Sequence, residues 1–217
     1  MSAFASRDVW IRKVRRNFED QGIGTVVQKA IAFALSPVYE QRTYRLYRIN
    51  LSAYSPQHSP ALEEMEFRLL SAADTQAVRE IEHLSEWLHG TLASRIEKGA
   101  ICLAAIENGR VAGFNLISFG DVAMPLIHLN RRFRRDEAWS EQISVSKDFR
   151  KRGLGAELRF RIFDELRKRG YRKLYGGALI DNAPSLKLAR RVGFEEFVDI
   201  QYRRLLSHSK WTYKRAK

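Results

Sequence analysis

The amino-acid sequence predicts one α/β domain of the α+β type over residues 61–217, behind a basic extension of residues 1–60. Three observations predict this class. Apolar runs of strand length alternate with stretches of helical periodicity. Asn108-Gly109, a two-residue turn signal, joins two apolar runs as a hairpin. A glycine-rich turn at residues 150–155 follows one strand and opens a long helix. A chain of 217 residues can bury one core of this size.

The extension is expected to contain two amphipathic helices and one strand. Trp10, Val14 and Phe18 recur every four residues with cations between them, which is typical of a basic amphipathic helix. We expect its apolar face to pack on the following domain or on a second copy of the chain, as in a homodimer. The alternative is that the helix lies on an anionic membrane surface. The remaining segments are a helix at 26–35, an alternating strand at 44–51 and a linker at 55–60.

The first half of the domain is expected to hold a strand, two helices and several further strands. The predicted segments are a strand at 66–70, helices at 74–85 and 86–98, strands at 101–106 and 111–118, a further strand at 124–130 and a polar loop at 131–137.

The centre of the domain carries the clearest pattern. Ala138–Val145 is expected to be a central strand, and a long helix follows the glycine turn. The apolar stripe of that helix is Leu154, Leu158, Ile162 and Leu166. Arg159 and Lys168 are expected to lie outside this stripe, and Gly170 is expected to end the helix.

The last elements follow from a cap and a stop signal. Lys173–Ile180 is the next expected strand, and Asn182 is expected to cap a helix that runs to about Arg191. Gly193 ends that helix, and residues 194–206 predict one or two final strands. The whole order is βααβββαβαβ.

Composition narrows the classes of function. The 38 Lys and Arg against 25 Asp and Glu give a formal net charge of +13, which favours an anionic partner: a phosphorylated cofactor, nucleic acid or an acidic membrane surface. Cys102 is the single cysteine, which excludes an intrachain disulfide and a cysteine-based metal site. The five histidines have no metal-ligand spacing, so no metal is expected. Without an apolar run of about 20 residues or a secretory signal, the chain is expected to be cytoplasmic.

The glycine turn, Arg150-Lys151-Arg152-Gly153-Leu154-Gly155, predicts an anion site. The first N–H groups of a helix have no intrahelical partner, and the helix dipole favours negative charge there. A P-loop is excluded because Ala156 and Glu157 stand where Lys and Ser or Thr are needed. A dinucleotide fingerprint fits poorly, because Leu158 replaces the third glycine and Asp181 follows too late to be the ribose-binding acid.

The pattern R-x-x-G-x-G resembles the acetyl-CoA pyrophosphate loop of the GNAT N-acyltransferase superfamily. Residues 181–185 and 192–194 also resemble that family's "N…GF" segment, and the two motifs stand in the family's order. The resemblance covers about residues 64–206. It implies a mixed, mostly antiparallel sheet with helices on both faces. It also implies an N-acetyltransferase that moves an acetyl group from acetyl-CoA to a primary amine by direct attack in a ternary complex.

The resemblance implies a cofactor site made largely of backbone groups. The central strand would pair with the pantetheine arm as an added strand does, and N–H groups of the turn would hold the pyrophosphate. A backbone N–H near Ile143 would polarise the thioester carbonyl. The expected cofactor-binding residues are Ile143, Ser144, Val145, Arg150, Lys151, Arg152, Gly153, Leu154, Gly155, Ala156 and Asn182.

The candidate catalytic residues are Glu141 and Tyr202. Glu141 shares strand parity with the cofactor strand residues, so we expect it to face the site as general base or as a group that binds the ammonium. Ala189 stands where many family members carry a tyrosine acid. Proton delivery to the thiolate is therefore left to Tyr175, Tyr202 or water, unless coenzyme A leaves as thiolate.

The acceptor is expected to bind near residues 83–98 and 119–137 and the last strands. The aromatic candidates there are Trp87, His89 and Trp139. The alternative function is non-catalytic acyl-CoA binding, or docking on RNA or an anionic membrane through the basic N-terminal helix and the tail 210–217.

Overall fold

The computed structural model describes residues 38–55 and 57–216. The chain divides into two compact units. The described residues of the larger unit are 43–55, 57–200 and 213–216, and those of the smaller unit are 38–42 and 201–212. The two helices predicted in the extension lie outside the described residues. Among the described residues, no helix is both long and apolar enough to cross a bilayer.

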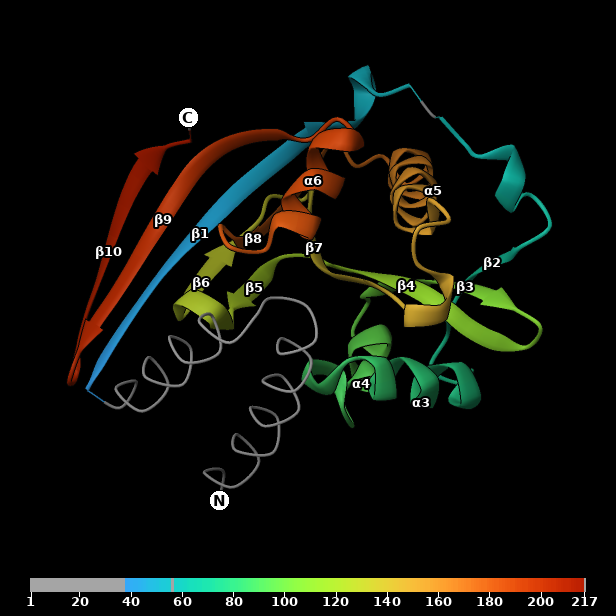
Figure 1. The fold of residues 1–217 in the computed structure, drawn as a ribbon, viewed down its shortest axis with the longest axis horizontal. Coiled ribbons are helices and arrows are strands. Elements are labelled where there is room, and N and C mark those ends of the chain that lie inside the picture. The colour runs from blue at the N-terminus through green and yellow to red at the C-terminus, as the bar shows by residue number, and fades with distance from the viewer. Residues whose placement is uncertain (1–37, 56, 217) are drawn as a thin grey trace. The chain divides into compact units, whose positions relative to one another are not determined.

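The larger unit is built on one mixed sheet (Figure 1). Its hydrogen-bonded order is β9-β1-β8-β7-β4-β3-β2. Neighbours from β1 to β2 in this order are antiparallel, except for the parallel pair β7-β8. The strands are β1 Tyr39–Asn50, β2 Glu66–Leu69, β3 Ile101–Glu107, β4 Arg110–Ser118, β7 Glu137–Val145, β8 Lys173–Leu179 and β9 Glu195–Leu205.

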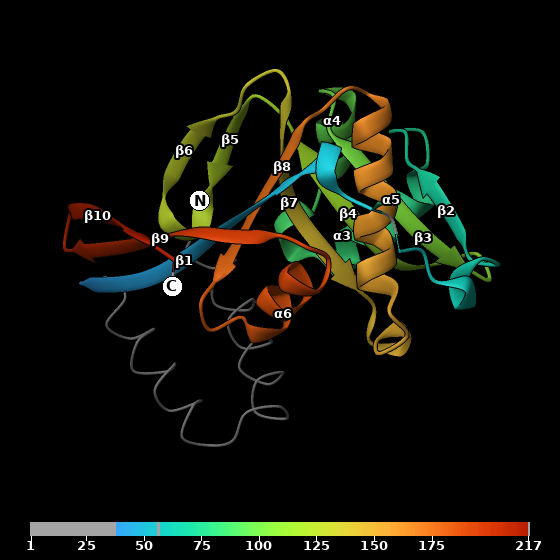
Figure 2. The same ribbon diagram turned by 90° about the horizontal axis from the view of Figure 1, so that it is seen from above.

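Helices cover both faces of this sheet, as Figures 1 and 2 show. One face packs against α5 and α6, and the other against α3 and α4. Apolar side chains fill both layers, so the predicted α/β class with helices on both faces is confirmed. The helices are α3 Thr75–Leu84, α4 Leu92–Glu97, α5 Leu154–Lys168 and α6 Ala183–Arg191, with short 3₁₀ turns η1 Leu51–Ala53, η2 Pro60–Leu62, η3 Glu86–Leu88, η4 Pro125–Ile127 and η5 Lys147–Phe149.

Helix α5 has the predicted limits and the predicted apolar stripe. It begins after Gly153 and is followed by Gly170, and both glycines have a positive φ of 83°. The four predicted stripe residues are buried. One expectation is wrong: Arg159 is only 3% exposed. Its side chain turns toward the sheet, where it donates to Ser140 of β7 and Asn115 of β4.

The hairpin between β3 and β4 confirms its turn signal. Asn108 and Gly109 have φ values of 53° and 72°, as a tight turn of this kind requires. The predicted strand at 124–130 is wrong. Instead a separate two-stranded hairpin forms, β5 Asp121–Met124 and β6 Leu129–Arg132. Pro125 starts a 3₁₀ turn between them because proline cannot donate to a strand ladder.

Strand β1 confirms the strand predicted in the extension and places it inside the sheet. It pairs with β8 from Tyr44↔Leu179 to Asn50↔Lys173. Gly176 and Gly177 of β8 make this pairing possible. A Cβ at Gly176 would overlap the Tyr47 ring, and one at Gly177 would overlap the Tyr44 ring. The two tyrosine rings therefore lie directly over the two glycines.

The smaller unit contains the start of β1, the end of β9 and most of β10, His208–Arg215. Glu40 pairs with Arg204 at 3.2 Å. Tyr202 packs on Trp211, with 5.6 Å between ring centroids. Most of the basic tail 210–217 belongs to strand β10, which covers residues 208–215.

Candidate functional site

Strands β7 and β8 part soon after they pair. Their register contains only Glu137↔Lys173, Ala138↔Leu174 and Trp139↔Tyr175, whereas β7 stays paired with β4 as far as Val145. Residues 137–140 are buried, but residues 141–145 are half-buried although β7 is a central strand. The edge of β7 that faces β8 is thus left without a strand partner in the described chain beyond residue 139. Such an edge can accept an extended ligand by main-chain hydrogen bonds.

A β-bulge lies at the start of this open edge. Ser140 pairs with Ile117 and Gln142 with Leu116, so Glu141 is an extra residue in β7. A bulge leaves one residue unpaired and shifts the alternation of side chains by one. The gap that opens between β7 and β8 beyond residue 139 is closed at this end. Backbone groups near Glu141 are therefore freed from the β7-β4 ladder at the closed end of this opening.

The bulge overturns the predicted parity of Glu141. Ile143 and Val145 pack against the apolar cluster on the α5 face. Glu141 instead contacts Arg95 of α4 and Ser118, on the opposite face. A regular strand would have placed all three side chains on one face.

Glu141 is held by two donors. Arg95 forms an ion pair with it, and the Ser118 hydroxyl donates at 2.5 Å. Its neighbour Gln142 accepts a hydrogen bond of 2.8 Å from Ser85 at the end of α3. Burial lowers the pKa of the Arg95 guanidinium. The carboxylate is thus fixed at the bulge with 24% of its side chain exposed.

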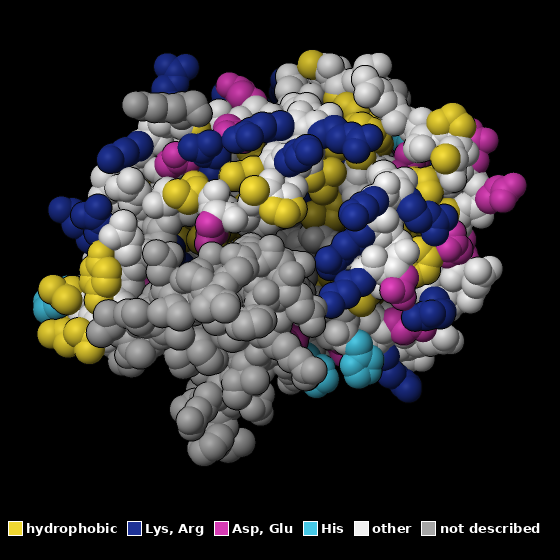
Figure 3. All heavy atoms as spheres, viewed as in Figure 1, with side chains coloured by type: hydrophobic (Ala, Val, Ile, Leu, Met, Phe, Trp, Pro, Cys, Tyr) yellow, Lys and Arg dark blue, Asp and Glu magenta, His cyan; other side chains and the backbone are white. Residues whose placement is uncertain are grey.

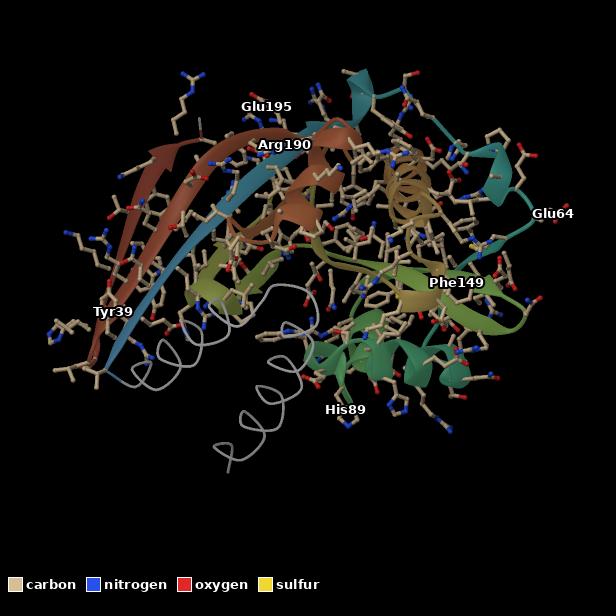
Figure 4. All side chains as sticks on the ribbon, in the orientation of Figure 1. Tyr39, Glu64, His89, Phe149, Arg190 and Glu195 are labelled. Carbon is tan, nitrogen blue, oxygen red and sulfur yellow. The ribbon has the colours of Figure 1, made fainter. Side chains whose placement is uncertain are left out.

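The glycine turn leads from the open end of β7 into α5. Phe149, labelled in Figure 4, ends the short η5 turn before it. Lys151 and Gly153 have positive φ values of 65° and 83°, and no side chain caps the helix. The N–H groups of Leu154 and Gly155 therefore have no intrahelical partner, whereas the Ala156 N–H donates to the Gly153 carbonyl at 2.9 Å.

The cations of this turn are engaged differently. Arg150 Nε donates to the Val145 carbonyl at 3.2 Å, which ties the turn to the end of β7. Arg152 makes a bidentate pair with Glu107 at 2.7 and 3.0 Å, and this pair lowers the pKa of that carboxyl. Figure 3 shows further Lys and Arg side chains spread over the visible face. Because the Arg152 side chain is paired with Glu107, a contact between Arg152 and an anion would come from its backbone N–H, as expected for the turn.

A pocket of about 300 Å³ lies against the turn. It is lined by Gln57, Ser59, Lys151, Arg152, Gly153, Ala156, Glu157, Phe160 and Arg191. Four of the predicted cofactor residues thus share one cavity. Arg191, at the end of α6, was not predicted as a site residue. Its signal in the sequence is the basic pair Arg190-Arg191, which closes the helix between the two parts of the second motif.

The predicted linker forms part of the pocket wall. His58 Nδ1 lies 2.9 Å from Glu157 Oε1, and its Nε2 lies 2.8 Å from Asp164 Oδ2. The Ser59 N–H donates to Glu157 Oε2 at 2.9 Å. These contacts fix residues 58 and 59 on α5. No sequence pattern indicated the contact of the linker with α5, because His58 and Glu157 are far apart in the sequence.

Asn182 caps α6, as predicted. Its Oδ1 accepts from the Ser185 N–H at 3.3 Å. Its proposed contact with the cofactor stays a prediction. Ala189, in the same helix, is buried.

The tyrosines considered as acids lie in different surroundings. Tyr175, at the last β7-β8 pair, donates to Glu137 at 3.1 Å. Burial and the Glu137 carboxylate raise the pKa of Tyr175. Tyr202 is buried in β9 within the smaller unit, 3.3 Å from the Ser209 hydroxyl. Its catalytic role stays a prediction.

The aromatics expected to line an acceptor pocket differ in exposure. Trp139 is buried and stacks on Phe133, so it belongs to the core. Trp87, in η3, is 56% exposed, and His89 follows it on the side of α3 and α4 (Figure 4). No group of three or more potential metal ligands occurs within the described residues.

Comparison with known proteins identifies relatives of this architecture. A family model described as "Acetyltransferase (GNAT) family" matches residues 43–194. The ribosomal protein bS18-alanine N-acetyltransferase of Escherichia coli (strain K12) is 30% identical over 130 residues, which are 58% of this chain and 78% of that protein.

Solved structures share the fold. The glucosamine N-acetyltransferase region of a fungal multi-domain β-N-acetylglucosaminidase superposes with a TM-score of 0.59 at 18% identity, over 84% of this chain and 23% of that one. A GCN5-related N-acetyltransferase from Sphaerobacter thermophilus gives 0.55 at 16% identity, over 83% and 57%. The chain thus spans well under two thirds of either structure. The family match, more than half of the chain in length, begins inside β1 and takes in the bulged strand and the glycine turn. The chain therefore belongs to the GNAT acetyltransferase family, and it is an acyltransferase.

Proposed function

We propose that this protein transfers an acyl group, acetyl in the first instance, from acyl-CoA to a primary amine. One observation carries the proposal. The edge of β7 that has no strand partner in the described chain runs from a bulge at Glu141 to Val145, where the uncapped start of α5 follows. An extended thioester with a pyrophosphate at one end matches these two features. The main-chain edge suits a pantetheine arm, and the helix N-terminus suits a phosphate.

The residues divide the binding between them. The backbone of residues 143–145 would pair with the pantetheine arm, and N–H groups of residues 152–156 would hold the pyrophosphate. Lys151 and Arg191 line the same pocket and would add positive charge. Asn182, whose Oδ1 already caps α6, would reach the cofactor through its amide nitrogen.

The bulge is the proposed place of the chemistry. The thioester supplies an activated carbonyl carbon, to which the neutral amine adds. The C–N bond forms, the C–S bond breaks, the amine gives up a proton, and the thiolate gains one or leaves as anion. Backbone N–H groups freed by the bulge would stabilise the oxyanion.

Glu141 is the proposed acidic group of the acceptor side. Because Arg95 and Ser118 fix its carboxylate, its role is to attract the ammonium and to accept its proton through water. Tyr202 as acid is a separate proposal, alongside Tyr175 and water.

For the acceptor, the amino terminus of a protein is the first candidate. The Escherichia coli relative is named for an alanine of a ribosomal protein. Polycationic acceptors are disfavoured, because the chain carries a net charge of +13.

Two measurements test the proposal. Thiol release from acetyl-CoA is followed across a panel of amines and of peptides with free amino termini. Turnover with a defined amine, reduced in Glu141→Gln, is expected. Acyl-CoA binding without turnover on any amine would instead indicate a non-catalytic binding protein.

In thermal melts, Gly153→Glu is expected to abolish protection by CoA, since it fills and charges the phosphate cradle. Protection that persists in this variant would refute the assigned site. Arg169→Met, at the far end of α5, is the matched control.

A further inference from the structure

Arg159 is a buried cation that has no acidic partner among the described residues. Its Nη1 donates to the Ser140 hydroxyl and, at 3.4 Å, to Asn115 Oδ1, and both acceptors are neutral. Within the described residues, Arg159 Nε and Asn115 Nδ2 are buried and have no hydrogen-bond partner. Burial lowers the pKa of the Arg159 guanidinium. The described part of the chain gives this charge no carboxylate.

A buried cation of this kind lowers the stability of the fold. A buried charge normally pairs with an opposite charge, because removal of a charge from water costs free energy. Arg45, also on the α5 face, shows the usual solution. It binds Asp199 through two contacts of 2.7 Å and Glu196 at 2.8 Å. Among the described residues Arg159 has no equivalent anion, and its Nε has no hydrogen-bond partner, so this donor is left for a ligand.

The position of Arg159 relates it to the opening between β7 and β8. Ser140 is the first residue of β7 after the last pair with β8. A Cβ at Gly155, one helical turn before Arg159, would lie 3.8 Å from Val145. Helix α5 therefore covers the α5 face of the opening from its open end at Val145 to its closed end at Ser140. The five residue steps of β7 from Ser140 to Val145 span about 16 Å.

The opposite side of this closed end is formed from β1. The Tyr47 ring lies over Gly176 of β8 and packs edge-on against Phe194 at 4.9 Å. The Arg159 guanidinium lies over the same Phe194 ring, 5.6 Å from its centroid. Burial raises the pKa of Tyr47, and the charge of Arg159 opposes this shift. The guanidinium thus lies between Ser140 of the bulged strand and the Phe194 ring, which Tyr47 also contacts.

We propose that Arg159, with Ser140 and Asn115, binds a carboxylate on the acyl group, so the preferred donor is an acyl-CoA whose acyl chain ends in a carboxylate. The inference rests on the proposed function, in which the pantetheine arm follows β7 from the glycine turn. An arm laid along that edge directs its acyl group toward the bulge and Ser140. A terminal carboxylate there meets a guanidinium shielded from water, where charge-assisted hydrogen bonds are strong. An acetyl group leaves this charge unpaired.

Calorimetric titration without any amine tests the inference, because no turnover then occurs. Succinyl-CoA and butyryl-CoA carry acyl chains of equal length and differ in the terminal carboxylate. The protein is expected to bind succinyl-CoA about tenfold to a hundredfold more tightly, as a hydrogen-bonded charge pair gives. Arg159→Met should abolish that preference by weakening the binding of succinyl-CoA. Its melting temperature without ligand should be equal or higher, because an unpaired buried charge is replaced by an apolar side chain.

The outcomes separate the two proposals. Equal affinity of the wild-type protein for both thioesters overturns this inference and leaves the proposed function standing, and this comparison needs no variant. A preference that survives Arg159→Met overturns the assignment to Arg159. Failure to bind any CoA thioester overturns the proposed function and the inference together. Arg169→Met, which removes a half-exposed arginine paired with Glu165 on the same helix, should keep the preference.

Discussion

Gly176→Ala is expected to destabilise the protein by forcing a side chain into the Tyr47 ring. The added Cβ would overlap Cε2 of the ring and lie 3.1 Å from Cζ and 3.2 Å from Cδ2. Tyr47 is buried and its ring packs on Phe194, so it has little freedom to move aside. Overpacking of this kind costs about 1–3 kcal/mol. With a urea m-value of about 2 kcal/mol/M, the midpoint should fall by about 0.5–1.5 M.

Urea unfolding followed by circular dichroism measures this loss. Tyr47→Leu shortens the side chain, so the double variant with Gly176→Ala should lose less stability than the sum of the two single changes. A coupling of about 1 kcal/mol or more is expected for residues in such contact. Gly155→Ala is the matched control, since its nearest neighbour is a flexible Leu188 methyl at 3.3 Å and alanine favours the helix. Additive effects, or an unchanged midpoint in Gly176→Ala, would refute the account of the glycine.

Three further outcomes are expected. Asn182→Ala should lower the free energy of unfolding by about 1 kcal/mol, measured in urea, because the Ser185 N–H loses its cap. Hydrogen bonds from Ser71 lower the pKa of Asp74, so its contribution to stability is present above the ordinary carboxyl pKa and is lost as pH falls through the lowered value. Asp74→Ala should therefore unfold at lower urea at neutral pH and show a weaker loss between neutral and acidic pH; parallel pH profiles would contradict this. Burial raises the pKa of the Cys102 thiol to about 12, so the native protein should resist alkylation at pH 8 and react only when unfolded.

The sequence could predict elements whose signals are local. The Asn108-Gly109 turn, the stripe of α5 and the Asn182 cap depend on residues within a few positions of one another, and each is confirmed. The glycine turn could be predicted for the same reason. Its glycines, cations and helix are contiguous in the chain.

What the sequence could not predict depends on pairing between distant strands. The bulge at Glu141 is visible only in the register of β7 against β4, and it turns the carboxylate to the opposite face from Val145. The burial of Arg159 likewise follows from Ser140 and Asn115, which belong to two other strands. A charged residue in a helix gives no local sign that it turns inward.

The same reasoning changes what Ala189 implies about catalysis. At the sequence level, an alanine where a tyrosine is common left proton delivery to Tyr175, Tyr202 or water, unless coenzyme A leaves as thiolate. In three dimensions, β1 brings Tyr47 over Gly176, on the α5 face. The Tyr47 hydroxyl donates to the Gly177 carbonyl at 3.4 Å; burial raises its pKa, and the charge of Arg159 opposes that shift. The α5 face of the opening thus has a tyrosine from another strand, placed there because β8 has no side chain at residue 176. Tyr47 thus lies in the same buried apolar cluster as Ala189 and Phe194, so the space beside the alanine is filled from another strand.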